Sequence, residues 1–190
     1  VKHSIFTPDG NYVVVGMYGE GPPRGIYVID LKNGTKMWSE PGAWGIGYVN
    51  ELEIYSDSEY IIATQSGGFG RIGVYGIESG LLWWSDSSNE SGEWLGGVSS
   101  IEFRPNLNEF YVQCDQYPTY LCKFNVTSFE SLERITLHTC WENSTTSCRV
   151  EKAFSPDGNL MAVLDIRHFR SGDYSTNAIT VYDATTFEKI

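Results

Sequence analysis

The chain has 190 residues, of which 41% are hydrophobic and 19% charged, enough to bury the core of one or at most two domains. Thirteen basic against 24 acidic residues give a formal net charge of -11, which argues against a nucleic-acid partner or an anionic membrane surface. Aromatic residues make up 14% and glycine contributes 20 residues, a composition that favours β-sheets joined by tight turns. No window approaches the roughly 20 apolar residues of a membrane span, so no span is expected in this chain.

Four segments of the chain resemble one another, and each opens with the end of an apolar strand followed by a turn. Taking Phe6, Ile54, Phe103 and Phe154 as equivalent positions gives spacings of 48, 49 and 51 residues. The first and last openings continue as Pro-Asp-Gly, in which the fixed φ of proline and the permissive glycine favour a tight turn. Each opening therefore predicts a hairpin between two strands.

Three further strands are predicted after each opening, in the same order in every repeat. The second strands are expected at residues 13–17, 61–65, 110–114 and 161–165. After a variable polar loop, alternating runs predict third strands at 25–31, 71–77, 120–126 and 178–184. A further turn leads to short fourth strands at 36–39, 81–85, 130–137 and, truncated by the end of the sequence, 187–190.

Four short antiparallel strands in each unit of about 50 residues predict an all-β fold made of β-propeller blades. Two repeats carry a common pair of motifs. The last repeat has Phe154-Ser155-Pro156-Asp157-Gly158 with Ile179-Thr180-Val181-Tyr182-Asp183, and the first has Phe6-Thr7-Pro8-Asp9-Gly10 with Ile26-Tyr27-Val28-Ile29-Asp30. In these residues the chain resembles the WD-repeat-like and quinoprotein-like (YVTN-type) propeller superfamily. The resemblance implies a fold and says little about activity, because this architecture carries unrelated functions.

A second pattern, Asp30-x-x-x-Gly34-x-x-x-Trp38, is similar to the tryptophan-docking pattern of quinoprotein propellers. The second repeat keeps Gly80 and Trp84 but has Gly76 at the position of Asp30. The resemblance implies that Trp38 and Trp84 lock one blade against the next by burying a large ring.

The expected domain organisation is a single propeller region over residues 1–190, with repeats at about 1–48, 49–97, 98–149 and 150–190. Closed members of the superfamily usually have more than four blades. Two architectures stay open, a partial propeller and a small closed one. An unpaired terminal blade would expose a sheet edge and an apolar face, which a partner would need to cover.

The four cysteines are Cys114, Cys122, Cys140 and Cys148, and they allow three disulfide pairings. Seven residues separate the members of each sequential pair, and the first pair flanks a predicted hairpin, so we favour the two local bridges. The alternative is four reduced thiols in an intracellular protein. No metal site is expected, because no Cys-x-x-Cys pair occurs and the three histidines are scattered.

Four Asn-x-Ser/Thr triplets occur, at Asn33, Asn89, Asn125 and Asn143. Asn33 and Asn125 fall at or just after the ends of third strands, Asn89 in the acidic loop 86–93 and Asn143 between Cys140 and Cys148, all places where an attached glycan would project into solvent. Asparagine, serine and threonine are also ordinary turn residues, which explains part of this placement. Paired cysteines and exposed triplets together favour a secreted or extracellular glycoprotein, with a cytoplasmic protein as the alternative.

No catalytic residue and no cofactor are expected. The chain lacks a Gly-x-Ser-x-Gly elbow, a His-Glu-x-x-His motif and a phosphate-binding Gly-Lys-Ser/Thr loop, and it lacks the adjacent cysteine pair of many quinoprotein dehydrogenases. A long loop is expected at 165–177, and its residues Arg167, His168, Phe169 and Arg170 are a candidate contact surface, with an ordinary surface loop as the alternative.

The function that these observations favour is that of a non-enzymatic extracellular propeller module. Its expected partners are a protein, a glycan or copies of itself, including as a subunit of a glycosylated extracellular fibre or coat. The alternative is an intracellular WD-repeat-like scaffold, and a fragment of a propeller enzyme is less favoured.

Overall fold

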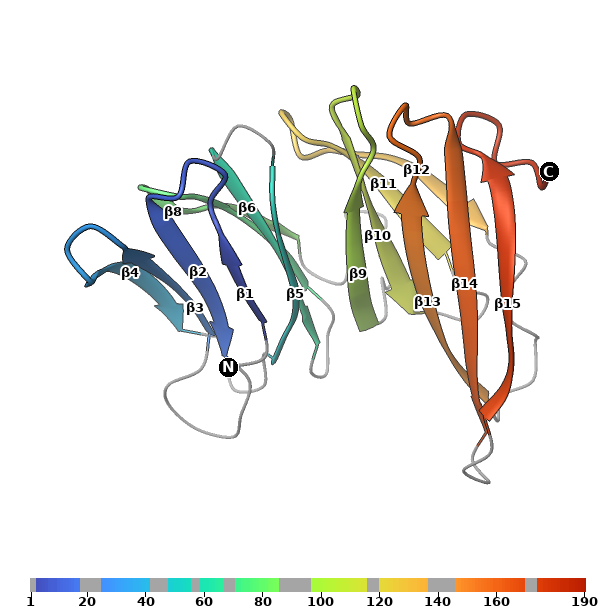
Figure 1. The fold of residues 1–190 in the computed structure, drawn as a ribbon, viewed down its shortest axis with the longest axis horizontal. Helices are drawn as coiled ribbons and strands as arrows, with labels where there is room; N and C mark the ends of the chain where they lie inside the picture. Colours follow the sequence, from blue (N-terminus) through green and yellow to red (C-terminus); the bar gives the residue numbers. More distant parts are fainter. Residues whose placement is uncertain are drawn as a thin grey trace. The chain divides into compact units, whose positions relative to one another are not determined.

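The computed structural model describes residues 3–17, 25–41, 48–55, 59–66, 71–85, 97–115, 120–136, 146–169 and 174–190. The described residues form strands and turns but no helix, and so none that is long and apolar enough to span a membrane. The strands belong to four antiparallel sheets (Figure 1). This arrangement confirms the predicted all-β fold of blade-like repeats.

Each sheet is a meander in which strands that follow one another in the chain are hydrogen-bonded neighbours. Sheet 1 contains β1 (His3–Phe6), β2 (Tyr12–Met17), β3 (Gly25–Asp30) and β4 (Thr35–Pro41). Sheet 2 contains β5 (Tyr48–Ile54), β6 (Tyr60–Ser66), β7 (Arg71–Gly76) and β8 (Gly80–Ser85). Sheet 3 contains β9 (Gly97–Phe103), β10 (Glu109–Asp115), β11 (Tyr120–Asn125) and β12 (Ser131–Thr136). Sheet 4 contains β13 (Thr146–Phe154), β14 (Leu160–Phe169) and β15 (Tyr174–Asp183).

The predicted fourth strand of the last repeat is present as a short pairing against β15. Lys189 forms an isolated antiparallel bridge with Tyr182, and the Ile190 N–H donates to the Val181 carbonyl at 3.0 Å. Sheet 4 therefore follows the same strand order as the other three sheets.

The same two backbone hydrogen bonds recur at the turns of all four repeats. The first closes the opening hairpin and joins Thr7 N to Tyr12 O, Tyr55 N to Tyr60 O, Arg104 N to Glu109 O and Ser155 N to Leu160 O, at 2.9 to 3.1 Å. The second ties the end of the third strand to that hairpin and joins Leu31 N to Asn11 O, Ile77 N to Glu59 O, Val126 N to Asn108 O and Ala184 N to Asn159 O. Each repeat found in the sequence therefore forms the same backbone hydrogen bonds at its turns.

A carboxylate organises the Pro-Asp-Gly turn of the first repeat. The Thr7 hydroxyl donates to Asp9 Oδ1, and the Asn11 N–H donates to the same oxygen at 3.0 Å. These hydrogen bonds, first the one from Thr7, hold the pKa of Asp9 below its usual value. The last repeat contains the same arrangement, formed by Ser155, Asp157 and Asn159.

A side-chain oxygen at the end of the third strand caps the following turn in three of the repeats. Asp30, Asn125 and Asp183 occupy this position, and each accepts hydrogen bonds from the backbone N–H groups two and three residues later, at 2.7 to 3.3 Å. The second repeat has Gly76 there, which has no side chain to act as a cap.

The chain divides into two compact units, Val1–Ile101 and Glu102–Ile190, and each is described by itself. In the first unit, one face of sheet 1 packs on one face of sheet 2 around the buried residues Val14, Ile26, Val28, Val49, Leu52, Ile54, Ile61, Ala63, Tyr75 and Ile77. In the second unit, sheets 3 and 4 share a core of Tyr111, Leu121, Ile135, Met161, Val163, Tyr182 and Ala184. Each core joins two neighbouring repeats, as in stacked blades.

The prediction of a loop at 165–177 is wrong for most of this segment, which forms strands. Residues up to Phe169 continue β14, and β15 begins at Tyr174. Arg167 pairs with Cys148 of β13 on one side and with Ser175 of β15 on the other. Because the backbone of this segment has strand partners on both sides, it stays extended despite its polar sequence.

Candidate functional site

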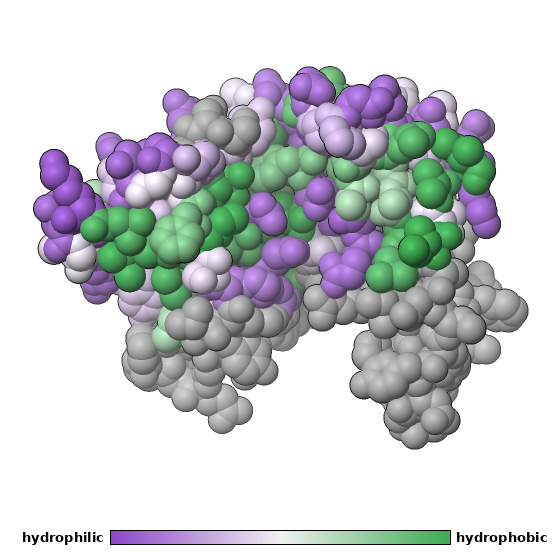
Figure 2. All heavy atoms as spheres, in the orientation of Figure 1, coloured by the Kyte–Doolittle hydropathy of each residue, from purple (hydrophilic) through white to green (hydrophobic). Residues whose placement is uncertain are grey.

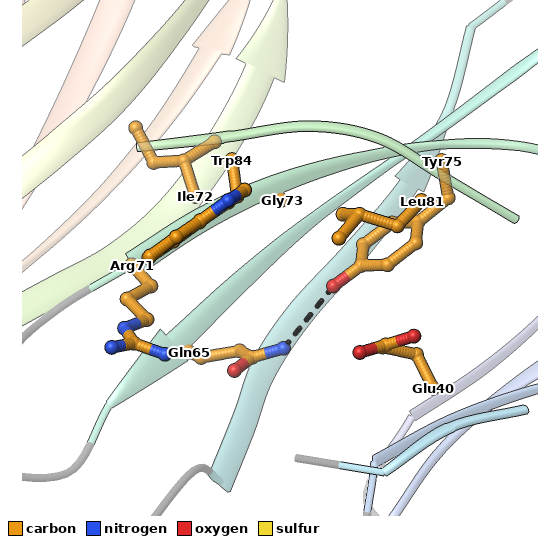
Figure 3. Close-up of a pocket in the computed structure, with 8 residues that line it drawn as sticks. All are labelled: Glu40, Gln65, Arg71, Ile72, Gly73, Tyr75, Leu81 and Trp84. Atoms are coloured by element: carbon orange, nitrogen blue, oxygen red, sulfur yellow. Dashed lines mark hydrogen bonds between the residues drawn. The ribbon is translucent and has the colours of Figure 1, made fainter. Parts of the chain in front are cut away.

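A pocket of about 110 Å³ lies in the first unit, mainly on the face of sheet 2 that packs against sheet 1. Its walls come from four strands, with Glu40 in β4, Gln65 in β6, Arg71, Ile72, Gly73 and Tyr75 in β7, and Leu81 and Trp84 in β8 (Figure 3). Gly73 pairs with Trp84 across the β7–β8 ladder, and a Cβ at this glycine would collide with the Tyr75 ring. The Tyr75 ring can lie over this position because Gly73 has no side chain.

The Tyr75 hydroxyl forms the polar floor of the pocket. The Gln65 Nε2 donates to this hydroxyl at 3.4 Å, and the Glu40 carboxylate lies nearby (Figure 3). Burial raises the pKa of Tyr75 well above its usual value, and the negative charge of Glu40 raises this pKa further. The hydroxyl therefore keeps its proton at any physiological pH and can donate it in a hydrogen bond.

Arg71 and Trp84 form the other side of the pocket. The Arg71 guanidinium carbon lies 4.9 Å from the centre of the Trp84 ring, within range of a cation–π contact. Trp84 is 47% exposed, so its ring is open to a partner in solution. This arrangement offers a partner a planar cation, a large apolar surface and, across the pocket, a carboxylate.

The lining residues provide charged, hydrogen-bonding and aromatic groups. No serine, threonine, cysteine or histidine is among the described residues of the walls. The volume suits one side chain or part of one sugar ring, since pockets for whole small molecules are several times larger. Among the residues that the structure describes, no cluster of three or more His, Cys, Asp or Glu could hold a metal ion.

Trp38 reaches from sheet 1 to sheet 2. Its Nε1 donates to the Ile77 carbonyl at 2.6 Å, and its ring stacks on Tyr75 with centroids 5.8 Å apart and planes 19° apart. Gly80, with φ +78°, lies next to this indole. A Cβ added at Gly80 would lie 3.9 Å from Cδ2 of Trp38. These contacts support a blade-locking role for Trp38, which we propose for this residue.

The strand register places Trp83, and not Trp84, at the position of sheet 2 that corresponds to Trp38. Trp38 pairs with Val28 in β3, and Trp83 pairs with Val74, the equivalent residue in β7. The turn between β7 and β8 is one residue shorter than the turn between β3 and β4, so equal spacing in the sequence does not give equal register. Trp83 is half-buried, whereas Trp84 faces the pocket.

The predicted bridge between Cys114 and Cys122 is confirmed. The two residues lie on one face of the β10–β11 hairpin, with Cα atoms 6.5 Å apart, and both are buried. Cys140 and the side chain of Cys148 lie outside the described residues, so their predicted bridge stays a prediction.

Removal of this disulfide is expected to destabilise the second unit. The double variant Cys114→Ala/Cys122→Ala should lower its free energy of unfolding by about 2 kcal/mol, because the unfolded chain gains the freedom of a short loop. Denaturant titration followed by circular dichroism measures the change. Addition of a reducing agent should bring the wild-type curve and the curve of the variant together, and two identical curves before reduction would contradict the Cys114–Cys122 bridge.

Two of the four predicted glycosylation sites lie among the described residues. Asn33 is exposed in the β3–β4 turn, and its Nδ2 donates to Asp30 Oδ2 at 2.9 Å. Asn125 is the half-buried turn cap at the end of β11. Asn89 and Asn143 lie outside the described residues. Of the predicted contact loop, Arg167, His168 and Phe169 belong to β14, and Arg170 is not described.

No family model matches the sequence, and neither does any curated protein. Solved structures do match. One is a dihydro-heme d1 dehydrogenase, NirN, in complex with DHE, at 16% identity with a TM-score of 0.65 over 98% of this chain and 36% of that chain. Another is the Cps50 (Swd1) β-propeller domain of Myceliophteria thermophila, at 12% identity with a TM-score of 0.67 over 98% of this chain and 52% of that chain.

The chain is built of β-propeller blades. Its resemblance to the propeller superfamily is confirmed at the level of fold, which is all that such low identities show. The chain spans 36% and 52% of the length of these two proteins, one an enzyme and one described as a propeller domain. Their activities and partners are therefore not carried over to it.

Proposed function

We propose that this chain is a non-enzymatic, extracellular β-propeller module that binds a protein or glycan partner through the pocket around Trp84. The observation that carries the proposal is the set of binding groups around Gly73: the Arg71 guanidinium, the Trp84 ring, the Tyr75 hydroxyl and the Glu40 carboxylate. Tryptophan, tyrosine and arginine are the side chains most enriched at the centres of protein interfaces. A pocket of this size takes one anchoring residue of a partner, or part of one sugar of a glycan chain.

Substitution of Trp84 by alanine is expected to weaken partner binding by tenfold or more, because Trp84 provides most of the apolar wall. The wild-type protein is first screened against two probe sets, an array of immobilised oligosaccharides and a library of immobilised peptides. The affinity for any probe that binds is then measured by titration. Leu82→Ala is the matched control, since Leu82 has the same 47% exposure on the same strand but does not line the pocket. A partner bound equally well by both variants would contradict the proposed site.

The proposed extracellular location is supported by the Cys114–Cys122 bridge, because disulfides persist in oxidising compartments. Intact mass of the protein from its native source, measured with and without reduction and glycosidase, tests this location. We expect a mass loss on glycosidase treatment and a gain of two hydrogens for each bridge reduced. Free thiols with no glycan would support the intracellular scaffold.

A second candidate function is association of the chain with its own copies. The specific observation behind it is that the first and last sheets each carry exposed apolar residues, among them Phe6 at 65% and Ile179 at 71% exposure.

A further inference from the structure

The outer face of sheet 4 is largely apolar and partly exposed. Ala153, Ala162 and Val181 lie side by side across β13, β14 and β15, and the next row consists of Glu151, Leu164 and Ile179. Ile179 is 71% exposed and Val181 is 36% exposed. The opposite face of the same sheet carries Met161, Val163 and Tyr182, which are buried in the core of the second unit.

The outer face of sheet 1 has the same character. Phe6, Val13 and Ile29 form one row across β1, β2 and β3, and Val15 and Tyr27 form part of the next. Phe6 is 65% exposed, and the other four side chains are only half-buried. Hydrophobic residues are visible at the surface over sheet 1 and over β14 and β15 (Figure 2).

Sheets 2 and 3 show what these faces would be like with a neighbour on each side. Residues 61–65 of β6 and 110–114 of β10 are buried without interruption, so both faces of these strands are covered. The strands of sheets 1 and 4 also have apolar residues on both faces, but only one face of each is buried.

The repeat register shows that the two outer faces are complementary halves of one kind of interface. On sheet 1, Val14 and Val28 belong to the face that packs on sheet 2, and their equivalents on sheet 4 are Ala162 and Val181, which belong to its outer face. On sheet 2, the face that packs on sheet 1 contains Ile61 and Tyr75. Their equivalents on sheet 1 are Val13 and Ile29 of the outer face, as the register shows.

We propose that the outer face of sheet 4 in one copy of the chain packs on the outer face of sheet 1 in a second copy, repeating the packing of sheet 1 on sheet 2. This inference rests on the second proposed function, association of the chain with its own copies. The contact joins two different surfaces, so it is head-to-tail. Two copies that make this contact in both directions form a closed dimer with eight sheets. One copy spans 52% of the length of the similar propeller domain, so two copies supply about that length.

The test uses two variants of the whole chain, each with a charge placed in one outer face. Ile179→Glu blocks the face of sheet 4, and Phe6→Glu blocks the face of sheet 1. Both side chains are exposed, so the variants should keep the folded circular dichroism spectrum of the wild type. Leu132→Glu is the matched control, because Leu132 is 48% exposed on β12 and lies on neither face.

Mass by light scattering after size exclusion is expected to show a dimer for the wild type and for Leu132→Glu, and a monomer for each blocked variant alone. An equimolar mixture of the two blocked variants should form a dimer again, because one intact sheet 4 face meets one intact sheet 1 face. A wild-type monomer at micromolar concentration would overturn the proposal. Dimers of Phe6→Glu alone would also overturn it, since they require contact between two identical faces.

The same samples separate this inference from binding at the pocket. Trp84→Ala should remain dimeric, and Ile179→Glu should bind the probe sets as well as the wild type does. A wild-type dimer that binds none of the probes would contradict only the pocket, and a wild-type monomer that binds a probe would contradict only the association.

Discussion

Replacement of Arg104 by methionine is expected to lower the free energy of unfolding of the second unit by about 3 kcal/mol. Arg104 is only 8% exposed, and its guanidinium joins the two sheets of this unit. Its Nε donates to the Gly158 carbonyl at 2.8 Å, and its Nη2 donates to Thr185 Oγ1 at 2.9 Å. Methionine fills a similar volume but leaves the buried Gly158 carbonyl without this donor.

A carboxylate also holds Arg104 in place. Glu109 Oε2 lies 3.9 Å from its Nη1 and accepts a hydrogen bond from the Tyr111 hydroxyl at 2.9 Å, while Lys123 approaches Glu109 Oε1 at 2.8 Å. Burial, and then the hydrogen bond to Glu109, raise the pKa of Tyr111 above its usual value. Because Lys123 remains as a partner, Glu109 is not left as an unpaired charge in the variant, which limits the expected loss.

Guanidinium denaturation of the variant, followed by tyrosine and tryptophan fluorescence, measures the effect. Thr185→Val removes a single hydrogen bond and should cost about 1 kcal/mol. Arg104→Lys keeps the charge but cannot reach both acceptors, so it should fall between the two. A stability of Arg104→Met within experimental error of the wild type would show that the arginine does not hold the two sheets together.

The repeat pattern predicts much of the fold because its signals are local. The pair Pro8 and Gly10 indicates a turn by backbone preference alone, and the same turn recurs at Pro156 and Gly158. The hydrogen bonds that close these turns span five residues, so a short stretch of sequence contains everything that determines them.

The hydrogen bonds of Arg104 could not be predicted from such local signals. It occupies the position that Thr7 and Ser155 hold in the other repeats, and this departure from the pattern is the signal that could have indicated a different role. Its acceptors lie 54 and 81 residues away in the chain, so their identity depends on the packing of sheet 3 on sheet 4.

The repeat pattern also did not predict the pocket, for a related reason. Gly73 and Trp84 meet only because of a register shift between Val74 and Tyr75, and the spacing of residues does not reveal such a shift. An equivalent shift occurs between Val28 and Ile29 in sheet 1, so it is the shorter β7–β8 turn that places Trp83, and not the predicted Trp84, at the position of Trp38.

Substitution of Trp38 by alanine is expected to lower the free energy of unfolding of the first unit by about 3 kcal/mol. The variant loses both the stacking of the indole on Tyr75 and the hydrogen bond from Nε1 to the Ile77 carbonyl, which together join β4 to sheet 2. Trp38→Phe keeps an aromatic ring against Tyr75 but loses the donor, so it should cost about 1 kcal/mol.

Trp84→Ala separates locking from binding in the same unit. Trp84 is 47% exposed and its ring contacts Arg71 of the same sheet, so its removal should change the free energy of unfolding by less than about 1 kcal/mol. Partner binding should respond in the opposite order, with a large loss for Trp84→Ala and a small one for Trp38→Phe. Equal destabilisation by the two alanine variants would contradict the assignment, because the locking role would then not belong to the tryptophan whose indole N–H reaches the neighbouring sheet.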